Sequence, residues 1–171
     1  ITSGLVGSEM CIRDSNTTDM TLASGAKINV ASTEIEAMLA DEEGGRLTIS
    51  DQNINVDSGT ISVDTANDLD ETTSGTVTAD ITTTESVTDL KTLTGTHAYT
   101  IVIATGDAET SSASDLTTIN GKTSVAVSLA NVTELTASSV SDLEALAEDI
   151  EANEFSNCLL YTSDAADEYS R

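Results

Sequence analysis

The stretch S-A-S-D-L-T-T-I-N-G-K-T-S-V-A-V-S-L at residues 112–129 predicts one short helix followed by one strand. Ser112 and Asp115 form an S-x-x-D pattern, in which the serine oxygen accepts from first-turn N–H groups and the acid lies at the positive end of the helix dipole. Apolar residues at three-residue steps then share one helix face. They are Ala113, Leu116 and Ile119.

Asn120-Gly121 is expected to end this helix, because glycine adopts the left-handed cap conformation without steric cost. The residues that follow alternate between apolar and polar with the two-residue period of a strand. The apolar members are Val125, Val127 and Leu129. The stretch therefore predicts a helix–glycine–strand unit.

The same unit recurs along the chain. One copy has Ser86, Asp89 and Gly95, with Val87, Leu90 and Leu93 on its helix face and Tyr99, Ile101 and Ile103 on its strand. Another copy has Ser139 and Asp142, with Val140, Leu143 and Leu146 on its helix face. Asp-Leu pairs begin at 68, 89, 115 and 142, which indicates a period of about 26 residues. The last helix is predicted over 139–153.

The first half of the chain predicts a more divergent version of the unit. A helix is expected over 32–43, with Ser32 as its cap and Gly44-Gly45 at its end, followed by a strand at 46–50. Residues 51–63 predict two strands that form a hairpin around Asp57-Ser58-Gly59. A weaker helix at 65–73 carries Asp68-Leu69, and a strand follows at 75–81.

Helices that alternate with strands at this spacing favour an α/β fold with a largely parallel sheet. A period of about 26 residues is typical of a solenoid-like stack of strand-plus-helix repeats. A mostly-β sandwich with short helices is the alternative. We expect residues 16–64 to form a divergent partial repeat with strands, and residues 65–157 to form the helix–strand repeats.

Both ends of the chain resemble translated sequencing-adapter read-through. L-V-G-S-E-M-C-I-R-D-S at 5–15 resembles the translation of a transposase-type adapter, and C-L-L-Y-T-S-D-A-A-D-E at 158–168 resembles the opposite adapter. The resemblance implies that residues 1–15 and 158–171 are artefacts, with 1–15 disordered, around a fragment from environmental DNA. Such segments are left out of fold reasoning.

The adapter resemblance changes what composition implies. Both cysteines, Cys11 and Cys158, lie in these ends, so residues 16–157 have neither a disulfide framework nor a cysteine nucleophile. The same segment has 25 acidic and four basic residues, a net charge of −21. This charge repels phosphates and therefore argues against nucleic-acid and anionic-membrane partners. No apolar run approaches the length of a membrane span.

Residues 65–150 resemble repeats of very large, acidic, Thr/Ser-rich bacterial cell-surface proteins of the adhesin-like kind. The resemblance is carried by S-A-S-D-L-T-T-I-N-G-K-T-S-V-A-V at 112–127 and L-T-G-T-H-A-Y-T-I at 93–101. It implies an extracellular or cell-surface location and a non-enzymatic role in adhesion or in the cell envelope. The implied partners are neighbouring repeats of the same longer chain, and surface glycans or proteins.

Two groups of acidic residues are candidates for a calcium site. Asp51, Asn53, Asn55 and Asp57 read D-x-N-x-N-x-D, but the EF-hand pattern requires glycine where Val56 stands and glutamate where Ser62 stands. The alternation with Ile54 and Val56 favours a strand with one wet face. The second group is Asp64, Asp68, Asp70 and Glu71, where a solvated helix start is favoured. The candidate metal ligands are thus Asp51, Asp57, Asp64, Asp68 and Asp70.

No residue pattern in the chain predicts catalysis. His97 is the only histidine and lacks the further ligands of a zinc site. The nucleophile motif G-x-S-x-G and the phosphate loop are both absent, and Gly121-Lys122-Thr123 is interpreted as a helix cap before a strand. We therefore expect no catalytic residues and no cofactor other than calcium.

Three functions are compatible with these patterns. The leading hypothesis is a structural or interaction fragment of a large secreted bacterial surface protein. The alternative is an extracellular module that calcium stiffens by screening its acids. A threonine-rich surface that binds ice or polysaccharide would need threonines in register on one face, which Thr82-Thr83-Thr84 does not supply because successive strand residues point to opposite faces.

Overall fold

A computed structural model describes residues 20–104, 111–136, 138–152 and 154–157. The adapter-like ends, residues 1–15 and 158–171, both lie outside the described residues, as does the prediction that residues 1–15 are disordered. The helices are a 3₁₀ turn η1 (Ser32–Glu34), α1 (Ile35–Glu43), α2 (Val63–Thr72), α3 (Val87–Leu90), α4 (Ala113–Asn120) and α5 (Val140–Glu151). The strands are β1 (Met20–Thr21), β2 (Lys27–Ala31), β3 (Leu47–Thr48), β4 (Asn53–Ser58), β5 (Val77–Asp80), β6 (Ala98–Thr100), β7 (Val127–Ser128) and β8 (Phe155–Ser156).

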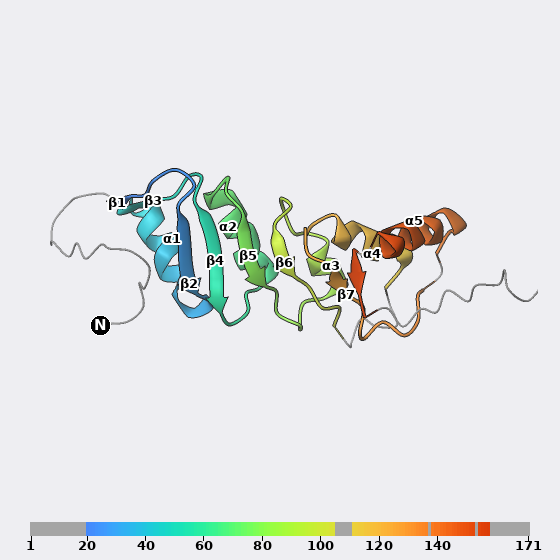
Figure 1. The fold of residues 1–171 in the computed structure, drawn as a ribbon. Coiled ribbons are helices and arrows are strands. Elements are labelled where there is room, and N and C mark those ends of the chain that lie inside the picture. Colours follow the sequence, from blue (N-terminus) through green and yellow to red (C-terminus); the bar gives the residue numbers. More distant parts are fainter. Residues whose placement is uncertain (1–19, 105–110, 137, 153, 158–171) are drawn as a thin grey trace, which may run out of the picture.

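Every strand pair among the described residues is parallel, and within the central sheet the strands are ordered as they occur in the chain. The central sheet has the order β2-β4-β5-β6, and the pairs β1–β3 and β7–β8 flank it. Two parallel bridges, His97 to Thr123 and Val102 to Ser128, connect the β6 segment to the β7 segment. The structure is therefore α/β with parallel sheets, and the β-sandwich alternative is wrong. Figure 1 shows the elements following one another in chain order along the long axis of the molecule.

The pairing register gives the spacing between successive units. Lys27 pairs with Asn53, Ile54 with Val77, and Thr78 with Ala98. Later along the chain Val127 pairs with Phe155. The crossovers between the neighbouring strands β2, β4, β5 and β6 each carry one helix, as do those leading to β7 and β8. Each successive strand of the central sheet is therefore reached through a crossover that contains a helix, and the first of these crossovers also contains β3.

Serine N-caps start four of the helices. The side chains of Ser62, Ser86, Ser112 and Ser139 each accept a hydrogen bond from the backbone N–H three residues later. At Ser112 and Ser139 the acid in that third position also bonds back to the N-cap backbone, which completes a capping box. The predicted starts of α3, α4 and α5 are confirmed.

The predicted alignment of α2 is wrong by one helical turn. Its cap is Ser62, and the third residue after the cap is Thr65 instead of an aspartate. Leu69 stands seven residues after Ser62, as Leu93 does after Ser86, so Asp68-Leu69 corresponds to Thr92-Leu93 and not to Asp89-Leu90. The helix accordingly begins at Val63, before the predicted start at 65.

Three other predictions are corrected. Residues 51–63 form no hairpin, since Ile61 makes a parallel bridge with Ile81 and Val63 already begins α2. Ser32 caps no helix, because η1 and α1 begin without a side-chain cap hydrogen bond. Gly121 ends α4 with φ −63°, whereas Gly95 takes the predicted left-handed conformation with φ +64°.

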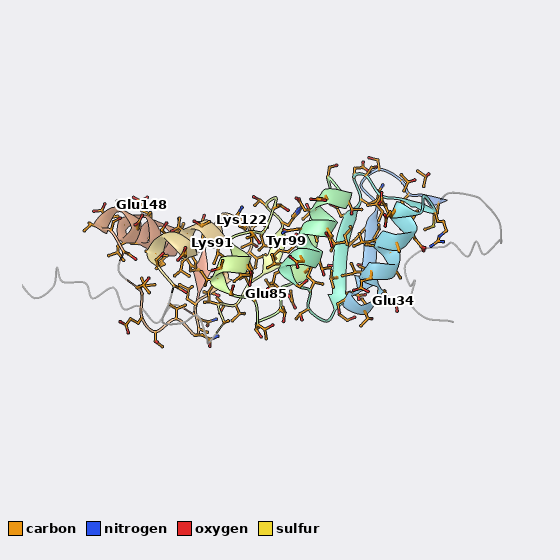
Figure 2. The ribbon with its side chains drawn as sticks, turned by 180° about the vertical axis from the view of Figure 1, so that it is seen from behind. Glu34, Glu85, Lys91, Tyr99, Lys122 and Glu148 are labelled. Atoms are coloured by element: carbon orange, nitrogen blue, oxygen red, sulfur yellow. The ribbon has the colours of Figure 1, made fainter. Side chains whose placement is uncertain are left out.

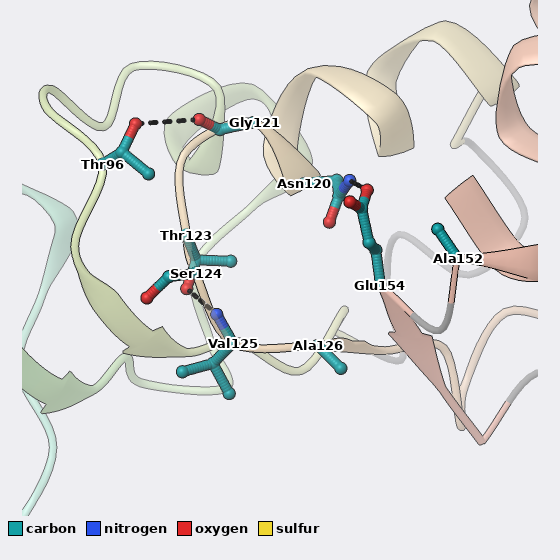
Figure 3. A pocket seen from close by; sticks show the side chains of 9 residues that line it. All are labelled: Thr96, Asn120, Gly121, Thr123, Ser124, Val125, Ala126, Ala152 and Glu154. Atoms are coloured by element: carbon teal, nitrogen blue, oxygen red, sulfur yellow. Dashed lines mark hydrogen bonds between the residues drawn. The ribbon is translucent and has the colours of Figure 1, made fainter. Parts of the chain in front are cut away.

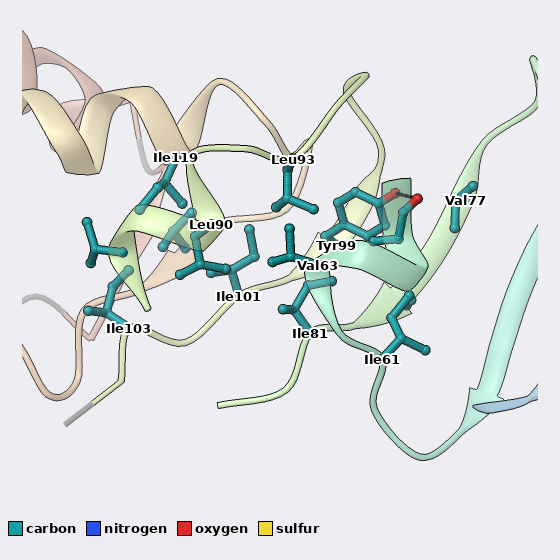
Figure 4. Close-up of a cluster of buried hydrophobic side chains, with 14 of the residues drawn as sticks. Ile61, Val63, Val77, Ile81, Leu90, Leu93, Tyr99, Ile101, Ile103 and Ile119 are labelled. Carbon is teal, nitrogen blue, oxygen red and sulfur yellow. Dashed lines mark hydrogen bonds between the residues drawn. The ribbon is translucent and has the colours of Figure 1, made fainter. Parts of the chain in front are cut away.

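The core is one continuous layer of aliphatic side chains between the strands and the helices. Strand positions such as Ile61, Ile81 and Ile101 are at most 4% exposed, and the helices cover them with Leu90 and other leucines. Figure 4 shows this row extending from Ile61 to Ile103, with Tyr99 as the large ring within it. Burial of such side chains stabilises each by roughly 1.5–3 kcal/mol. Since the layer is continuous, each unit is buried by its neighbours.

Candidate functional site

The candidate calcium ligands do not converge. Asp51 accepts hydrogen bonds from Ser24 Oγ and Gln52 Nε2, and Asp70 pairs with His97. Asp57, Asp64 and Asp68 are exposed, the first at the end of β4 and the other two on α2. In the part of the chain that the structure describes, no group of three or more His, Cys, Asp or Glu side chains could hold a metal ion.

The D-x-N-x-N-x-D stretch forms a strand with one polar face, as the alternation predicted. Ile54 is fully buried, whereas Asn55 points to the other side and donates from Nδ2 to Asn29 Oδ1 at 3.1 Å. Asn29 and Asn55 are register partners on β2 and β4. The asparagines therefore join two neighbouring strands on the polar face of the sheet.

The most constrained polar group in the core is the pair His97 and Asp70. His97 Nε2 lies 2.6 Å from Asp70 Oδ1, and His97 Nδ1 accepts from the Val77 backbone N–H at 3.2 Å. Because Nδ1 accepts a hydrogen bond, its proton must be on Nε2, which donates to the carboxylate. His97 is 7% exposed, and each of its ring nitrogens makes a hydrogen bond within the protein. It therefore links α2, β5 and the start of β6, and neither nitrogen is available to a substrate.

The contact with His97 affects the pKa of the Asp70 carboxyl. Partial burial raises the pKa of Asp70, but hydrogen bonds from His97 and Thr94 and the proximity of the His97 ring together hold this pKa below its ordinary value. Gly95 makes room for the pair, since a Cβ at this position would lie 2.3 Å from Asp70 Oδ1 and 2.8 Å from His97 Nε2. The left-handed backbone at Gly95 adds a second reason for glycine.

Tyr99 extends the polar group into the core. Its ring meets the His97 ring edge-to-face, with centroids 5.4 Å apart, and its hydroxyl donates to the Ala66 carbonyl at 3.3 Å. Burial raises the pKa of Tyr99, and the Asp70 charge raises it further. The phenol is therefore a neutral donor that connects β6 to α2.

The Thr123 side chain forms hydrogen bonds with the backbone of Tyr99. Its Oγ1 accepts from the N–H groups of Tyr99 and Val125, both at 3.1 Å, and donates to the Tyr99 carbonyl at 2.7 Å. A side-chain hydroxyl thus stands where backbone groups of the next strand would otherwise pair. Gly121-Lys122-Thr123 is confirmed as a helix cap followed by a strand-forming residue.

An open cavity of about 430 Å³ lies between the loop that precedes β6 and the segments that follow α4 and α5 (Figure 3). Its lining is mainly small polar and aliphatic side chains. The lining residues are Thr96, Asn120, Gly121, Thr123, Ser124, Val125, Ala126, Ala152 and Glu154. Asn120 Nδ2 donates to Glu154 Oε2 across it, so two of its polar groups already satisfy each other. The cavity contains no histidine or cysteine and no pair of carboxylates.

An ion pair joins two neighbouring helices. Lys91 Nζ lies 2.6 Å from Asp115 Oδ1, between the end of α3 and the first turn of α4. Partial burial raises the pKa of Asp115, but hydrogen bonds from Lys91 and Ser112 outweigh burial and lower this pKa. Sequence reasoning missed this pair and the His97–Asp70 pair, because their members are 24 and 27 residues apart. The period of about 26 residues was the one signal that could have suggested both.

Replacing Asp70 by asparagine is expected to lower the free energy of unfolding at pH 7 by about 1–3 kcal/mol, because it removes a charged acceptor from a buried donor. A carboxyl whose pKa is depressed by folding contributes stability above its unfolded pKa of about 3.9, and this contribution is lost as the pH falls through the folded pKa. Urea unfolding of both proteins should therefore show a difference at pH 7 that shrinks toward pH 3.

Asp68→Asn is the matched control for this prediction, because Asp68 lies on the same helix and is exposed. Its effect should stay within about 0.5 kcal/mol. If the Asp70→Asn difference persisted unchanged at pH 3, the ionised carboxylate would not be the stabilising group.

The described residues include no helix that is long and apolar enough to cross a membrane. Comparison with known proteins gives no relative from which a role could be transferred: no family model, no curated protein and no solved structure matches the chain.

Proposed function

We propose that the chain is a non-enzymatic structural segment, a solenoid-like stack of helix–strand units from a large secreted bacterial surface protein with a role in adhesion or in the cell envelope. The resemblance of residues 65–150 to acidic, Thr/Ser-rich surface repeats supports the location and the role. The sequence-ordered parallel strands support the stack.

The observation that carries this proposal is that polar side chains tie each unit to the next at about one period of separation. Asn29 and Asn55 are 26 residues apart, Asp70 and His97 are 27 apart, and Lys91 and Asp115 are 24 apart. Farther along, Asn131 Nδ2 donates to the Ile103 carbonyl across 28 residues. A structure whose hydrogen bonds join consecutive units resists being pulled apart along its length, which is what a surface spacer requires.

The charge distribution fits an exposed extracellular segment. Glu34, Glu85 and Glu148 lie at the periphery of three different units, while Tyr99 is enclosed (Figure 2). A surface of this sign disfavours nucleic acid and anionic lipid as partners. Surface glycans or proteins, together with neighbouring units of the same chain, remain the proposed partners.

Mechanical unfolding tests the structural role. Pulled from its two ends in an optical trap, the full chain should lengthen in discrete steps that are multiples of about 9 nm, the extended length of one unit of about 26 residues. The expected reason is that each unit is held by its neighbours. Smooth extension without steps would overturn the proposed structural stack.

The calcium-stiffened alternative is tested by melting the chain in EDTA and in millimolar calcium. Under the leading proposal the midpoint temperature changes by no more than it does with an equal ionic strength of sodium chloride. A calcium-specific rise of several degrees would favour the alternative, because a ligand that binds only the folded state raises its stability.

A further inference from the structure

The last helix carries an apolar surface that its counterparts bury. Val140 is 72% exposed and Leu143 is 44% exposed, although both belong to the apolar stripe of α5. We propose that this surface, Val140 with Leu143, is the docking face for one further helix–strand unit that continues the stack. The proposal rests on the proposed function and names a specific partner for it.

Equivalent positions in the preceding helices are buried. Val140 and Leu143 are the first and fourth residues after the cap Ser139. The first and fourth residues after Ser112 are Ala113 and Leu116, which are fully buried. After Ser86 the same places hold Val87 and Leu90, at most 7% exposed. These buried residues belong to the aliphatic layer between the helices and the strands, and α5 packs beside α4 at one end of that layer (Figure 1). A further helix–strand unit after β8 would extend the layer over Val140 and Leu143.

The strand of this unit offers the second half of the docking face. Among the described residues, β8 pairs with β7 and with no other strand. Its other edge presents backbone donors and acceptors to a further parallel strand. The proposed face therefore continues two established interfaces at once, helix against helix and strand beside strand.

The charge at this face specifies the chemistry of the partner helix. Between α3 and α4, the fifth residue after one cap, Lys91, bonds to the third residue after the next cap, Asp115. The fifth residue after Ser139 is Glu144, which is exposed. An acid in the third position of the next helix would therefore face another acid. The partner unit should begin S-x-x-Lys or S-x-x-Arg where the units in this chain begin S-x-x-Asp.

The same charge argues against a second copy of this chain as the occupant. Each copy carries a formal net charge of −24 and therefore repels another copy. A single unit with a complementary basic residue meets no such repulsion at Glu144.

An extended chain tests the proposal. After Asn157 it receives a copy of residues 130–138 followed by a copy of residues 112–129, with Asp115→Lys in the copy. If the added helix covers Val140 and Leu143, hydrogen exchange of the α5 amides should slow by about tenfold or more, because burying two aliphatic side chains opposes local opening. The double variant Val140→Asp with Leu143→Asp should return the exchange to the rate of the parent chain.

The controls separate docking from folding. In the parent chain the double variant should change α5 exchange less than about twofold, because both side chains are already exposed there. Ser141→Asp adds one negative charge about 100° around the helix from Val140 and should leave the protection in the extended chain in place. A copy that keeps Asp115 should protect α5 less than the Asp115→Lys copy.

Two results would overturn the proposal. One is equal α5 exchange in the parent and extended chains, which would leave the stepwise mechanical unfolding, and with it the proposed function, unaffected. The other is concentration-dependent association of the parent chain, seen by sedimentation and abolished by the double variant, which would make a second copy the occupant.

Discussion

Replacing Gly75 by alanine is expected to lower the free energy of unfolding by about 3 kcal/mol, the upper end of the usual cost of inserting a methyl group into a packed site. A Cβ at this position would lie 2.3 Å from the Gln52 carbonyl oxygen and 2.9 Å from that of Asp51. Both atoms are backbone, so no side-chain rotation relieves the clash. The approach is this close because Ser74 and Thr73 also bond to the preceding unit, at the carbonyls of Ser50 and Gln52.

Gly121→Ala is the matched control for Gly75→Ala. Gly121 has a right-handed backbone, and the nearest atom to an added Cβ is 3.5 Å away. Because alanine also restricts the unfolded chain, this substitution should be neutral or stabilise by about 0.4–1 kcal/mol. Urea unfolding of the two variants measures both effects. Equal costs at the two glycines would mean that the close approach to Gln52 is not what requires Gly75.

Replacing Tyr99 by alanine should lower the free energy of unfolding by about 3–5 kcal/mol, as expected for truncation of a fully buried aromatic ring. Tyr99 is fully buried, its ring meets the His97 ring and its hydroxyl donates to the Ala66 carbonyl. The cavity left behind would lie between two units, so we expect the units on both sides to lose protection together in hydrogen exchange.

Tyr99→Phe separates the ring from its hydroxyl. It removes the hydrogen bond to Ala66 and should cost about 1 kcal/mol. The measurement is chemical unfolding monitored by circular dichroism, since the variant removes a phenol signal. A loss with phenylalanine as large as with alanine would show that the hydroxyl, and not the packing of the ring, holds the units together.

Local chemistry was sufficient to predict the helices that begin with S-x-x-D. Serine and aspartate satisfy the first-turn N–H groups within four residues of chain, so no distant partner is needed, and α3, α4 and α5 all start where this pattern places them. Where the third residue is Thr65, the same cap forms at Ser62 but leaves a weaker pattern, and the predicted helix was displaced toward Asp68-Leu69.

The hairpin prediction failed because turn residues do not specify a pairing partner. Asp57 and Ser58 end β4 and Gly59 takes a left-handed backbone with φ +81°, yet Ile61 then pairs in parallel with Ile81 of the next unit. The preference arises from burial: Ile61 joins the same core row as Ile81 and Ile101 only in this arrangement. The sequence of residues 51–63 alone does not indicate that Ile61 pairs with Ile81.

The sequence and the tertiary structure determined different features of this protein. Apolar spacing, serine caps and a period of about 26 residues follow from the amino-acid sequence, and they are enough to predict an α/β chain of recurring helix–strand units with parallel strands. The contacts of Asp70 with His97, of Thr123 with Tyr99, and of Gly75 with Gln52 arise only when one unit lies in register on the next. Hydrogen bonding and close packing act over about 3 Å, so the residue that a side chain meets one period away is set by the stacking of units and not by its own neighbours in the chain.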